Sequence, residues 1–408
     1  MPRIIFLNRY FYPDHSATSQ LVTDLAFHLA AGGREVHVVT SRQRYDEPGS
    51  ELAANESAGG VEIHRVVSTR FGRSGLIGRA LDYASFYASA WRALRTLARP
   101  GDIIVAKTDP PLLSILGAKA ARRRKTHLIN WLQDLYPEVA VELGVPLIGV
   151  LGPALTGMRD RSLAAADANV VLGERMAARV AARGVPAERI KIIANWADDE
   201  QIVPVAATEN PLRKKWGLGD KFVVGYSGNL GRAYEFETLL GAAEKLRGDS
   251  RIGFLFIGGG KQFDAVAARV NERGLSSAFH FLPYQDRAAL KYSLGVPDVH
   301  WVSLKPALEG LLFPSKLYGI LAAGRPVIAV SARNGEIAAL VERHDCGIAV
   351  EPGNAEGLAG AIIALAQDDR RRDDMGRRAR ALLETEFSRT RALSRWQKLI
   401  EKVGGAKA

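Results

Sequence analysis

The sequence predicts an α/β protein made of two doubly wound, Rossmann-like domains. Short apolar runs of strand type alternate with helical segments along the whole chain, which is typical of parallel sheets covered on both faces. This alternation occurs in two series, and residues 199–220 between them have no periodicity and are expected to form a linker. With 408 residues, the chain is long enough for two domains that each bury a core.

The first series opens with a βαβ unit. Residues 3–8 form its first strand, residues 19–29 have apolar positions at helical spacing, and residues 35–40 form its second strand. The loop 8–18 lacks the Gly-x-Gly-x-x-Gly fingerprint, which argues against a dinucleotide cofactor. Further strands are expected at 61–66, 103–106, 127–131, 168–172 and 190–193.

The second series has the same alternation without repeating the first sequence. Its helices are expected to begin near Phe236 and to end with the segments 355–366, 371–385 and 390–403. Its strands are expected at 222–227, 253–258, 279–282, 299–302, 327–330 and 347–350.

Composition narrows the class of protein. Aromatic residues (8%), charged residues (24%) and hydrophobic residues (47%) have the proportions of a soluble globular protein. Cys346 is the only cysteine, so no intramolecular disulfide can form, and no signal peptide precedes the first strand. The longest uncharged run, 143–158, is too short to span a bilayer. These features favour a cytoplasmic location.

Positive charge is concentrated in the first half of the chain. The 55 lysines and arginines exceed the 44 aspartates and glutamates, for a net charge of +11. Such a surface can bind nucleic acid, anionic lipid or a phosphorylated substrate, or can serve solubility alone. The clustered basic residues are Arg65, Arg70, Arg73, Arg79, Arg92, Arg95, Arg99, Arg122, Arg123, Arg124 and Lys125.

The helical segment 71–99 carries apolar and aromatic residues mostly on one side, with arginines around them. Core packing with a solvated basic face explains this pattern. A helix lying at the interface of an anionic membrane explains it too, and the apolar run 143–158 would then belong to the same face.

The stretch 310–329 reads as a loop, a helix of about three turns and a buried strand. Pro314 and Ser315 favour a helix start, and Gly324 favours a left-handed helix end. A helix start offers unpaired N–H groups to an anion, and Lys316 in the first turn is disfavoured by the helix dipole unless something negative is bound. The pattern predicts a diphosphate site. An ordinary helix with a solvated lysine would have the same sequence pattern.

This stretch resembles the donor-binding motif of retaining glycosyltransferase family 4, in which a Glu-Gly pair, a Pro-containing loop and a helix ending Ala-x-Gly-x-Pro-Val follow one another. Its form Pro-Ser-Lys-Leu-Tyr-Gly-Ile-Leu-Ala-Ala-Gly is most similar to the subgroup that builds bacterial exopolysaccharide and O-antigen repeats. The resemblance covers nearly the whole chain and implies the GT-B fold, with two facing domains and a C-terminal helix that crosses back to the first. We therefore expect an acceptor-side domain at 1–198 with 388–408, and a donor domain at 204–387.

The resemblance is incomplete at the acidic positions. The two glutamates of the family, eight positions apart, would fall on Leu311 and Gly319. We assign the first role, next to the sugar, to Glu309 through a shifted loop, and no residue is assigned to the ribose. Asp134 follows Gln133 where the family often has a His-Asp pair; it is a candidate to hydrogen-bond the sugar or the acceptor, or a helix N-cap.

The resemblance also implies a donor site in the second half. Arg232 follows a glycine-rich turn, which lets the backbone approach phosphate oxygens, and we expect Arg232 and Lys316 to bind the diphosphate. A gapless alignment puts Asn229 and Tyr234 where the family has its arginine and lysine. The other expected donor-binding residues are Gly228, Asn229, Gly231, Gly258, Gly259, Pro283, Tyr284, Pro314, Ser315 and Leu317.

The acceptor side is expected at the carboxyl ends of the first series of strands, where ligands of such sheets bind. Small residues replace the glycines that the family usually has in the first loop. The expected residues are His15, Ser16, Ala17, Thr18 and Asp109.

The implied reaction transfers a sugar from a nucleotide diphosphate donor to a saccharide or lipid-linked acceptor, with retention. UDP is favoured over GDP by family frequency, and neither a metal nor a cofactor is expected, since no Asp, His or Cys cluster occurs. An anionic membrane surface at the inner face of the plasma membrane is a further candidate partner. The alternatives are a nucleotide-sugar epimerase of the same architecture and a non-enzymatic nucleic-acid binder; nucleic acid is not the expected partner.

Overall fold

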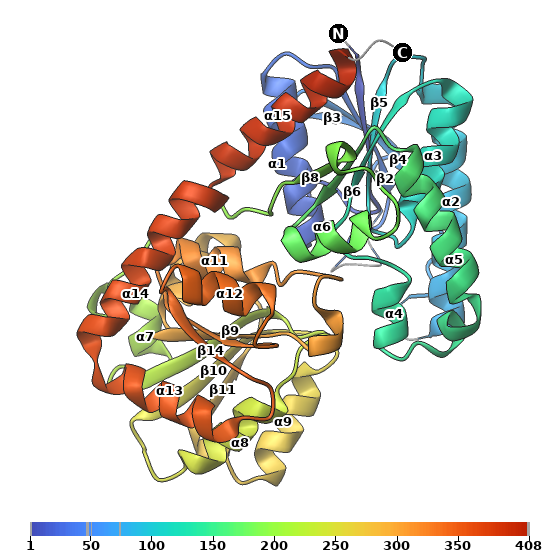
Figure 1. Ribbon diagram of the computed structural model, residues 1–408. Helices are drawn as coiled ribbons and strands as arrows, with labels where there is room; N and C mark the ends of the chain where they lie inside the picture. Colours follow the sequence, from blue (N-terminus) through green and yellow to red (C-terminus); the bar gives the residue numbers. More distant parts are fainter. Residues whose placement is uncertain (1, 46–48, 50, 73–74, 406–408) are drawn as a thin grey trace. The chain divides into compact units, whose positions relative to one another are not determined.

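The computed structural model describes residues 2–45, 49, 51–72 and 75–405, and the chain forms two compact units (Figure 1). Arg73 lies outside the described residues. The first unit contains Met1–Ala194, Gly310–Phe313 and Ala392–Ala408, and the second contains Asn195–Glu309 and Pro314–Arg391. The chain thus enters the first unit again for four residues, immediately before the expected donor-binding helix.

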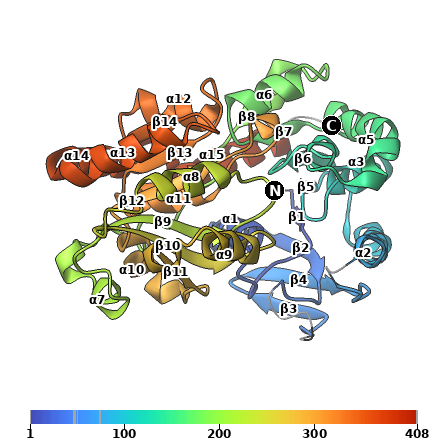
Figure 2. The same cartoon turned by 90° about the horizontal axis from the view of Figure 1, so that it is seen from below.

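The first unit contains an eight-stranded sheet in the order β3-β4-β2-β1-β5-β6-β7-β8 (Figure 2). All neighbours are parallel except β3, which pairs antiparallel with β4. The sequence did not predict β3, because its four residues are polar or small and none is buried. The strands are β1 (Ile4–Leu7), β2 (Val36–Ser41), β3 (Asn55–Ala58), β4 (Val61–Val66), β5 (Ile103–Lys107), β6 (His127–Trp131), β7 (Ala168–Val171) and β8 (Ile190–Ile192).

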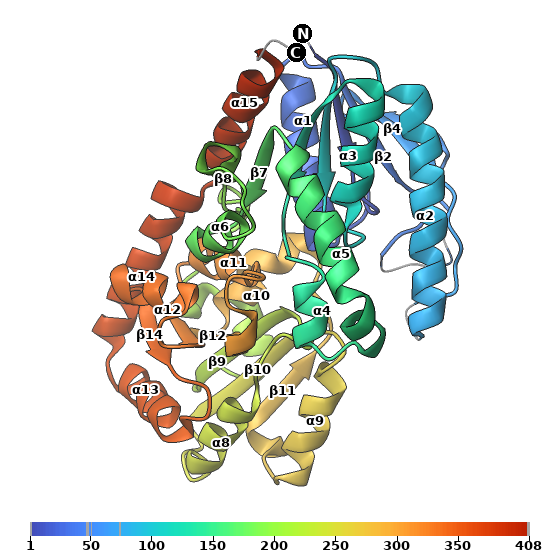
Figure 3. The ribbon, with the colours of Figure 1, turned by 45° about the vertical axis from the view of Figure 1, so that its right-hand side comes forward.

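Helices cover both faces of this sheet, as expected for a doubly wound fold. Helices α2 (Leu76–Leu97), α3 (Leu113–Arg124) and α5 (Pro146–Ala165) lie on one face (Figure 3). Helix α1 (Ala17–Ala31) and the part of α15 (Arg389–Gly405) that belongs to this unit lie on the other. Short helices α4 (Glu138–Glu142) and α6 (Glu174–Ala181) and the turn η1 (Ala187–Arg189) complete the unit.

The second unit contains a fully parallel six-stranded sheet in the order β11-β10-β9-β12-β13-β14 (Figure 2). Aromatic rings fill its core; Phe254 and Phe279, for example, stack with ring centroids 4.6 Å apart. The strands are β9 (Phe222–Asn229), β10 (Ile252–Gly259), β11 (Phe279–Leu282), β12 (Val299–Ser303), β13 (Val327–Val330) and β14 (Gly347–Val350). The helices are α7 (Pro211–Lys215), α8 (Glu237–Lys245), α9 (Phe263–Glu272), α10 (Leu290–Gly295), α11 (Lys316–Ala322), α12 (Glu336–Arg343), α13 (Ala355–Gln367) and α14 (Asp369–Leu382), which continues as a π turn (Leu383–Phe387).

Two segments of this unit differ in detail from the sequence predictions. Residues 199–220, expected to form a linker without periodicity, contain η2 (Ala207–Glu209) and α7, and the Arg380 guanidinium donates to the carbonyls of Asp199 (3.0 Å) and Ile202 (2.9 Å). The expected three-turn helix is shorter, because α11 has seven residues. Its end is as predicted: Gly324 is left-handed (φ +61°) and the Arg325 N–H donates to the Ile320 carbonyl.

Candidate active site

Lys316 and the turn after β9 come together at the carboxyl edge of the second sheet. Lys316 begins α11, and its Nζ lies 3.6 Å from the centroid of the Tyr234 ring and 5.1 Å from that of Tyr226. A Cβ atom on Gly228 would lie 3.7 Å from Lys316 Cε. Two residues that the sequence analysis assigned to the donor are therefore neighbours.

The Lys316 ammonium has an unusual electrostatic environment. Burial alone lowers the pKa of Lys316 to about 7, and no charged group among the described residues contributes to this shift. The two tyrosine rings provide only the weak attraction of their negative faces. A bound anion would favour the charged form and raise this pKa, so the side chain is suited to bind a phosphate group.

Glycines are required where β9 and β10 end. Gly228 (φ +125°) and Gly258 (φ +134°) have backbone conformations that other residues rarely adopt. A Cβ on Gly258 would lie 2.2 Å from the Gly228 carbonyl oxygen, and one on Gly259 would lie 3.2 Å from the Tyr284 ring. Backbone conformation explains Gly228 without a ligand, and close packing explains Gly258 as well. The Tyr284 ring, which is 60% exposed, covers Gly259 and is available to a planar group.

The remaining expected donor-binding residues differ in how far they are exposed to solvent. Asn229, Arg232, Pro283 and Ser315 are exposed, and Gly231 is partly buried. Ser315 precedes α11 but makes no side-chain capping hydrogen bond. Pro314 is buried, and Leu317 is fully buried, so only the backbone of Leu317 could contact a donor.

Glu309 is buried and has a structural role that the sequence did not suggest. Its Oε2 accepts a hydrogen bond from the backbone N–H of Glu336 (3.2 Å) at the start of α12. A carboxylate in this position is favoured by the helix dipole. A Cβ on Gly335 would lie 2.3 Å from Glu309 Oε1, so a glycine is needed there. Only the fold could show this contact between residues far apart in the sequence.

The loop after β1 in the first unit is organised by Asp14, which the sequence analysis did not single out. Its Oδ1 accepts from the Ser16 N–H (2.8 Å), and its carbonyl accepts from the Ser19 hydroxyl (3.1 Å). His15 and Ala17 are exposed, and Ser16 and Thr18 are partly buried. The small residues of this loop are therefore held at the start of α1.

Asp134 and Asp109 follow the neighbouring strands β6 and β5. Burial, and to a lesser extent the charge of Asp109, raises the pKa of Asp134 to about 6, while Lys107 opposes this shift. The alternative that Asp134 is an N-cap is wrong, because α4 begins after Pro137. Asp134 instead forms an antiparallel bridge with Leu312, and the Leu135 N–H donates to the Leu311 carbonyl (2.8 Å).

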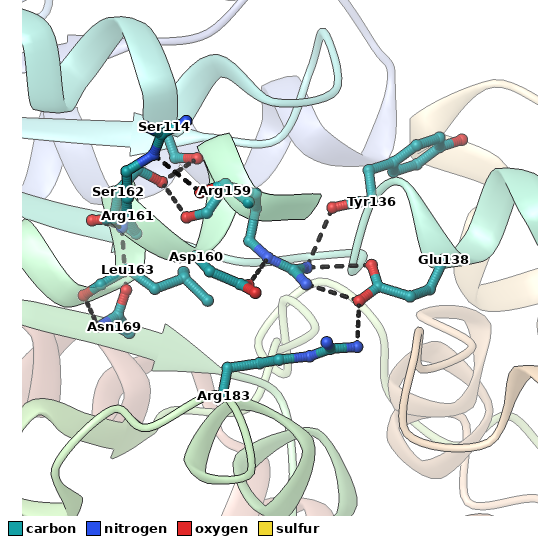
Figure 4. A network of polar contacts seen from close by, with 12 residues as sticks. Ser114, Tyr136, Glu138, Arg159, Asp160, Arg161, Ser162, Leu163, Asn169 and Arg183 are labelled. Carbon is teal, nitrogen blue, oxygen red and sulfur yellow. Dashed lines mark hydrogen bonds and ion pairs between the residues drawn. The ribbon is translucent and has the colours of Figure 1, made fainter. Parts of the chain in front are cut away.

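A buried arginine holds the loop that follows Asp134 (Figure 4). Arg159 on α5 donates to the Tyr136 carbonyl (3.0 Å) and to both carboxylate oxygens of Glu138 (3.1 and 2.6 Å). Arg183 also donates to Glu138 Oε1 (3.0 Å). Bidentate pairs of this kind fix geometry as well as charge, so the network fixes the loop at the carboxyl edge.

The described residues contain no group of three His, Cys, Asp or Glu side chains placed to hold a metal ion. None of the described helices is both long and apolar enough to cross a membrane.

Comparison with known proteins links each half of the chain to a family. Residues 17–196 match the glycosyl transferase 4-like domain, and residues 208–382 match the glycosyl transferases group 1 family. A relative in Escherichia coli K12, the putative colanic acid biosynthesis glycosyl transferase WcaI, is 26% identical over 88% of this chain and 91% of its own length. The probable glycosyltransferase WbjE of Pseudomonas aeruginosa is 26% identical over 72% of this chain and 73% of its own.

Solved structures agree in fold. The crystal structure of Anabaena HepE in complex with UDP has a TM-score of 0.72 at 15% identity, covering 98% of this chain and 100% of that chain. Each half of the chain thus matches a glycosyltransferase domain model, and its two α/β units have the fold of GT-B glycosyltransferase structures.

Proposed function

We propose that the protein transfers a sugar from a nucleotide diphosphate donor to an acceptor hydroxyl, with retention of the anomeric configuration. The observation that carries this proposal is Lys316, a partly buried lysine at the carboxyl edge of the second sheet whose pKa is lowered to about 7 by desolvation alone. A diphosphate on this side chain would stabilise its charge, and the lysine would in turn stabilise the leaving group.

Arg232 and the start of α11 are proposed to assist Lys316. The exposed guanidinium of Arg232 lies in the turn after β9 and can pair with phosphate oxygens, and the Tyr284 ring can stack on the nucleotide base. In this proposal protein groups neutralise the diphosphate. By family resemblance, the acceptor attacks from the side of the leaving group, and the leaving phosphate takes its proton.

Glu309 is proposed to contact the donor sugar, and Asp134 and Asp109 are proposed to hydrogen-bond the acceptor. Asp134 is ionised only above a pH of about 6. An ionised carboxylate accepts hydrogen bonds from sugar hydroxyls, whereas a protonated one accepts fewer. Transfer is therefore expected to increase as the pH rises through this value.

A lipid-linked acceptor at a membrane surface is part of the proposal, supported by exposed apolar side chains. Phe71 lies just before α2, and Ile77 and Leu81 lie in its first turns; Ile77 is 79% exposed. Val150 and Leu151 are exposed near the start of α5. Helix α2 follows β4, and α5 follows α4 in the connection after β6. Both helices start beyond the carboxyl ends of these strands (Figure 3).

Thermal shift with UDP, GDP and ADP tests the donor class, with UDP the expected ligand. A ligand at 100 times its Kd adds about 2.7 kcal/mol of stability. Absence of any shift would contradict the proposal.

Incubation with a nucleotide sugar then distinguishes the rival epimerase. An epimerase converts the donor without an acceptor, whereas a transferase consumes it in proportion to added acceptor.

A further inference from the structure

A buried lysine lies on the acceptor side of the first unit. Lys107 is the last residue of β5, and only 1% of its surface is exposed. Lysines are almost never fully buried unless they are paired, yet no ion pair of Lys107 is found among the described residues. Burial lowers its pKa well below the usual range, against the opposing charges of Asp109 and Asp134.

Two specific contacts hold the Lys107 ammonium. Its Nζ lies 3.8 Å from the centroid of the Trp131 ring and donates a hydrogen bond to the carbonyl of Thr18 (3.0 Å). Trp131 is packed in turn against Trp396 of α15, with ring centroids 4.5 Å apart, and both indoles are fully buried. The amine is therefore fixed in position by the Trp131 ring, which Trp396 holds in place, and by the Thr18 carbonyl.

The Thr18 contact ties the end of β5 to the first turn of α1. Lys107 thus joins three segments of the proposed acceptor side: the start of α1, the segment of Asp109 and the loop of Asp134.

We propose that Lys107 is a positioning residue of the acceptor side, which fixes the first turn of α1 and places a positive charge beside Asp109 and Asp134. This proposal rests on the proposed function, because that function defines the acceptor side. Lys107 itself does not touch the reacting atoms in this assignment; it acts through Thr18 and Asp134.

The test uses the full-length protein and the variants Lys107→Met and Lys107→Arg. Hydrogen exchange of the amides in residues 14–22 should become at least tenfold faster in Lys107→Met, while the Kd for UDP is unchanged. Lys119→Met is the matched control: Lys119 lies 4.7 Å from the Trp91 ring in the same unit but is exposed, so its loss should leave exchange at α1 unchanged.

A kinetic test separates positioning from simple structural support. With UDP-glucose as donor and octyl glucoside as acceptor, Lys107→Met should raise the KM for acceptor at least tenfold. In a plot of transfer activity against pH, the acid limb of Lys107→Met should also move upward by about one pH unit. The reason is that Asp134 loses an opposite charge while Asp109 and Tyr136 remain. Lys107→Arg keeps the charge and should keep the limb in place.

The outcomes are separable. Unchanged exchange at α1 together with an unmoved acid limb would overturn the positioning role. If the wild-type protein binds no nucleotide, the proposed function fails, and hydrogen exchange alone then decides whether Lys107 fixes α1. If Lys107→Met does not fold, Lys107→Arg carries the test, because its larger head group should still speed exchange at residues 14–22 without moving the limb.

Discussion

The Nζ atom of Lys316 lies 3.6 Å from the centroid of the Tyr234 ring, in contact with an aromatic face instead of a carboxylate. Replacement of Lys316 by Met keeps the stem and removes the charge. Nucleotide affinity should fall about ten- to a hundredfold, because a hydrogen bond to a charged group contributes about 1.5–3 kcal/mol. Isothermal titration calorimetry with UDP measures this. Arg232→Ala should weaken binding as well.

Lys261→Met provides the control for this variant. Lys261 is exposed in the turn that follows β10, and its replacement should leave the Kd unchanged. Wild-type affinity in both Lys316→Met and Arg232→Ala would show that the diphosphate binds elsewhere.

The pH dependence of nucleotide binding follows from the same lysine. The ligand-free pKa of Lys316 is about 7 and should rise when a diphosphate binds. Above pH 7 the free protein has lost the proton that the complex retains, so binding takes up a proton and affinity falls as the pH rises from 7 to 9. Titrations in buffers of different ionisation enthalpy measure this uptake. Lys316→Met should show none; uptake that persists in the variant would assign the proton to another group.

Glu309 can be tested for its two roles separately. Glu309→Gln retains an oxygen that can accept from the Glu336 N–H, so urea unfolding should change little. Glu309→Ala leaves that N–H without this acceptor and should cost about 1–3 kcal/mol. If the carboxylate also contacts the sugar, the glutamine variant should fold normally and transfer sugar poorly. Full activity in Glu309→Gln would leave Glu309 only its role at the start of α12.

Membrane binding is tested at the first turns of α2. The double variant Ile77→Ser and Leu81→Ser should reduce binding to vesicles that contain anionic lipid, and salt should weaken the binding of the wild type. Ile363→Ser, which replaces an exposed residue on α13 of the second unit, is the control. Equal binding of wild type and double variant, or no binding by either, would show that these side chains are ordinary surface residues without a role in membrane binding.

The sequence predicted most of the fold because buried parallel strands read as short apolar runs. All strands except β3 were expected, since β3 alone offers no apolar pattern. Helix α7, with five residues, and the turn η2, with three, could not be predicted from periodicity, because helices this short complete too few turns to show it. Gly324 was predictable, because a left-handed helix end strongly favours glycine.

The site was predictable only where a local motif carries it. The stretch from Pro314 to Gly324 identified Lys316, but the tyrosine rings beside it come from another part of the chain. Lys107 reads as the polar end of a strand, and nothing near it in the sequence shows that its amine contacts Thr18 and Trp131. Long-range packing decides such environments.

Trp396 has a consequence for the order in which the protein is made. Ribosomes release the N-terminal part of a chain first, and domains generally fold as they emerge. The core around Trp131, however, receives Trp396 from α15, beyond the second unit in the sequence. The first unit to be synthesised is therefore finished only after the second has been translated. Its indole pair cannot form before Trp396 has been made, and nascent chains that stall in the second unit leave Trp131 uncovered.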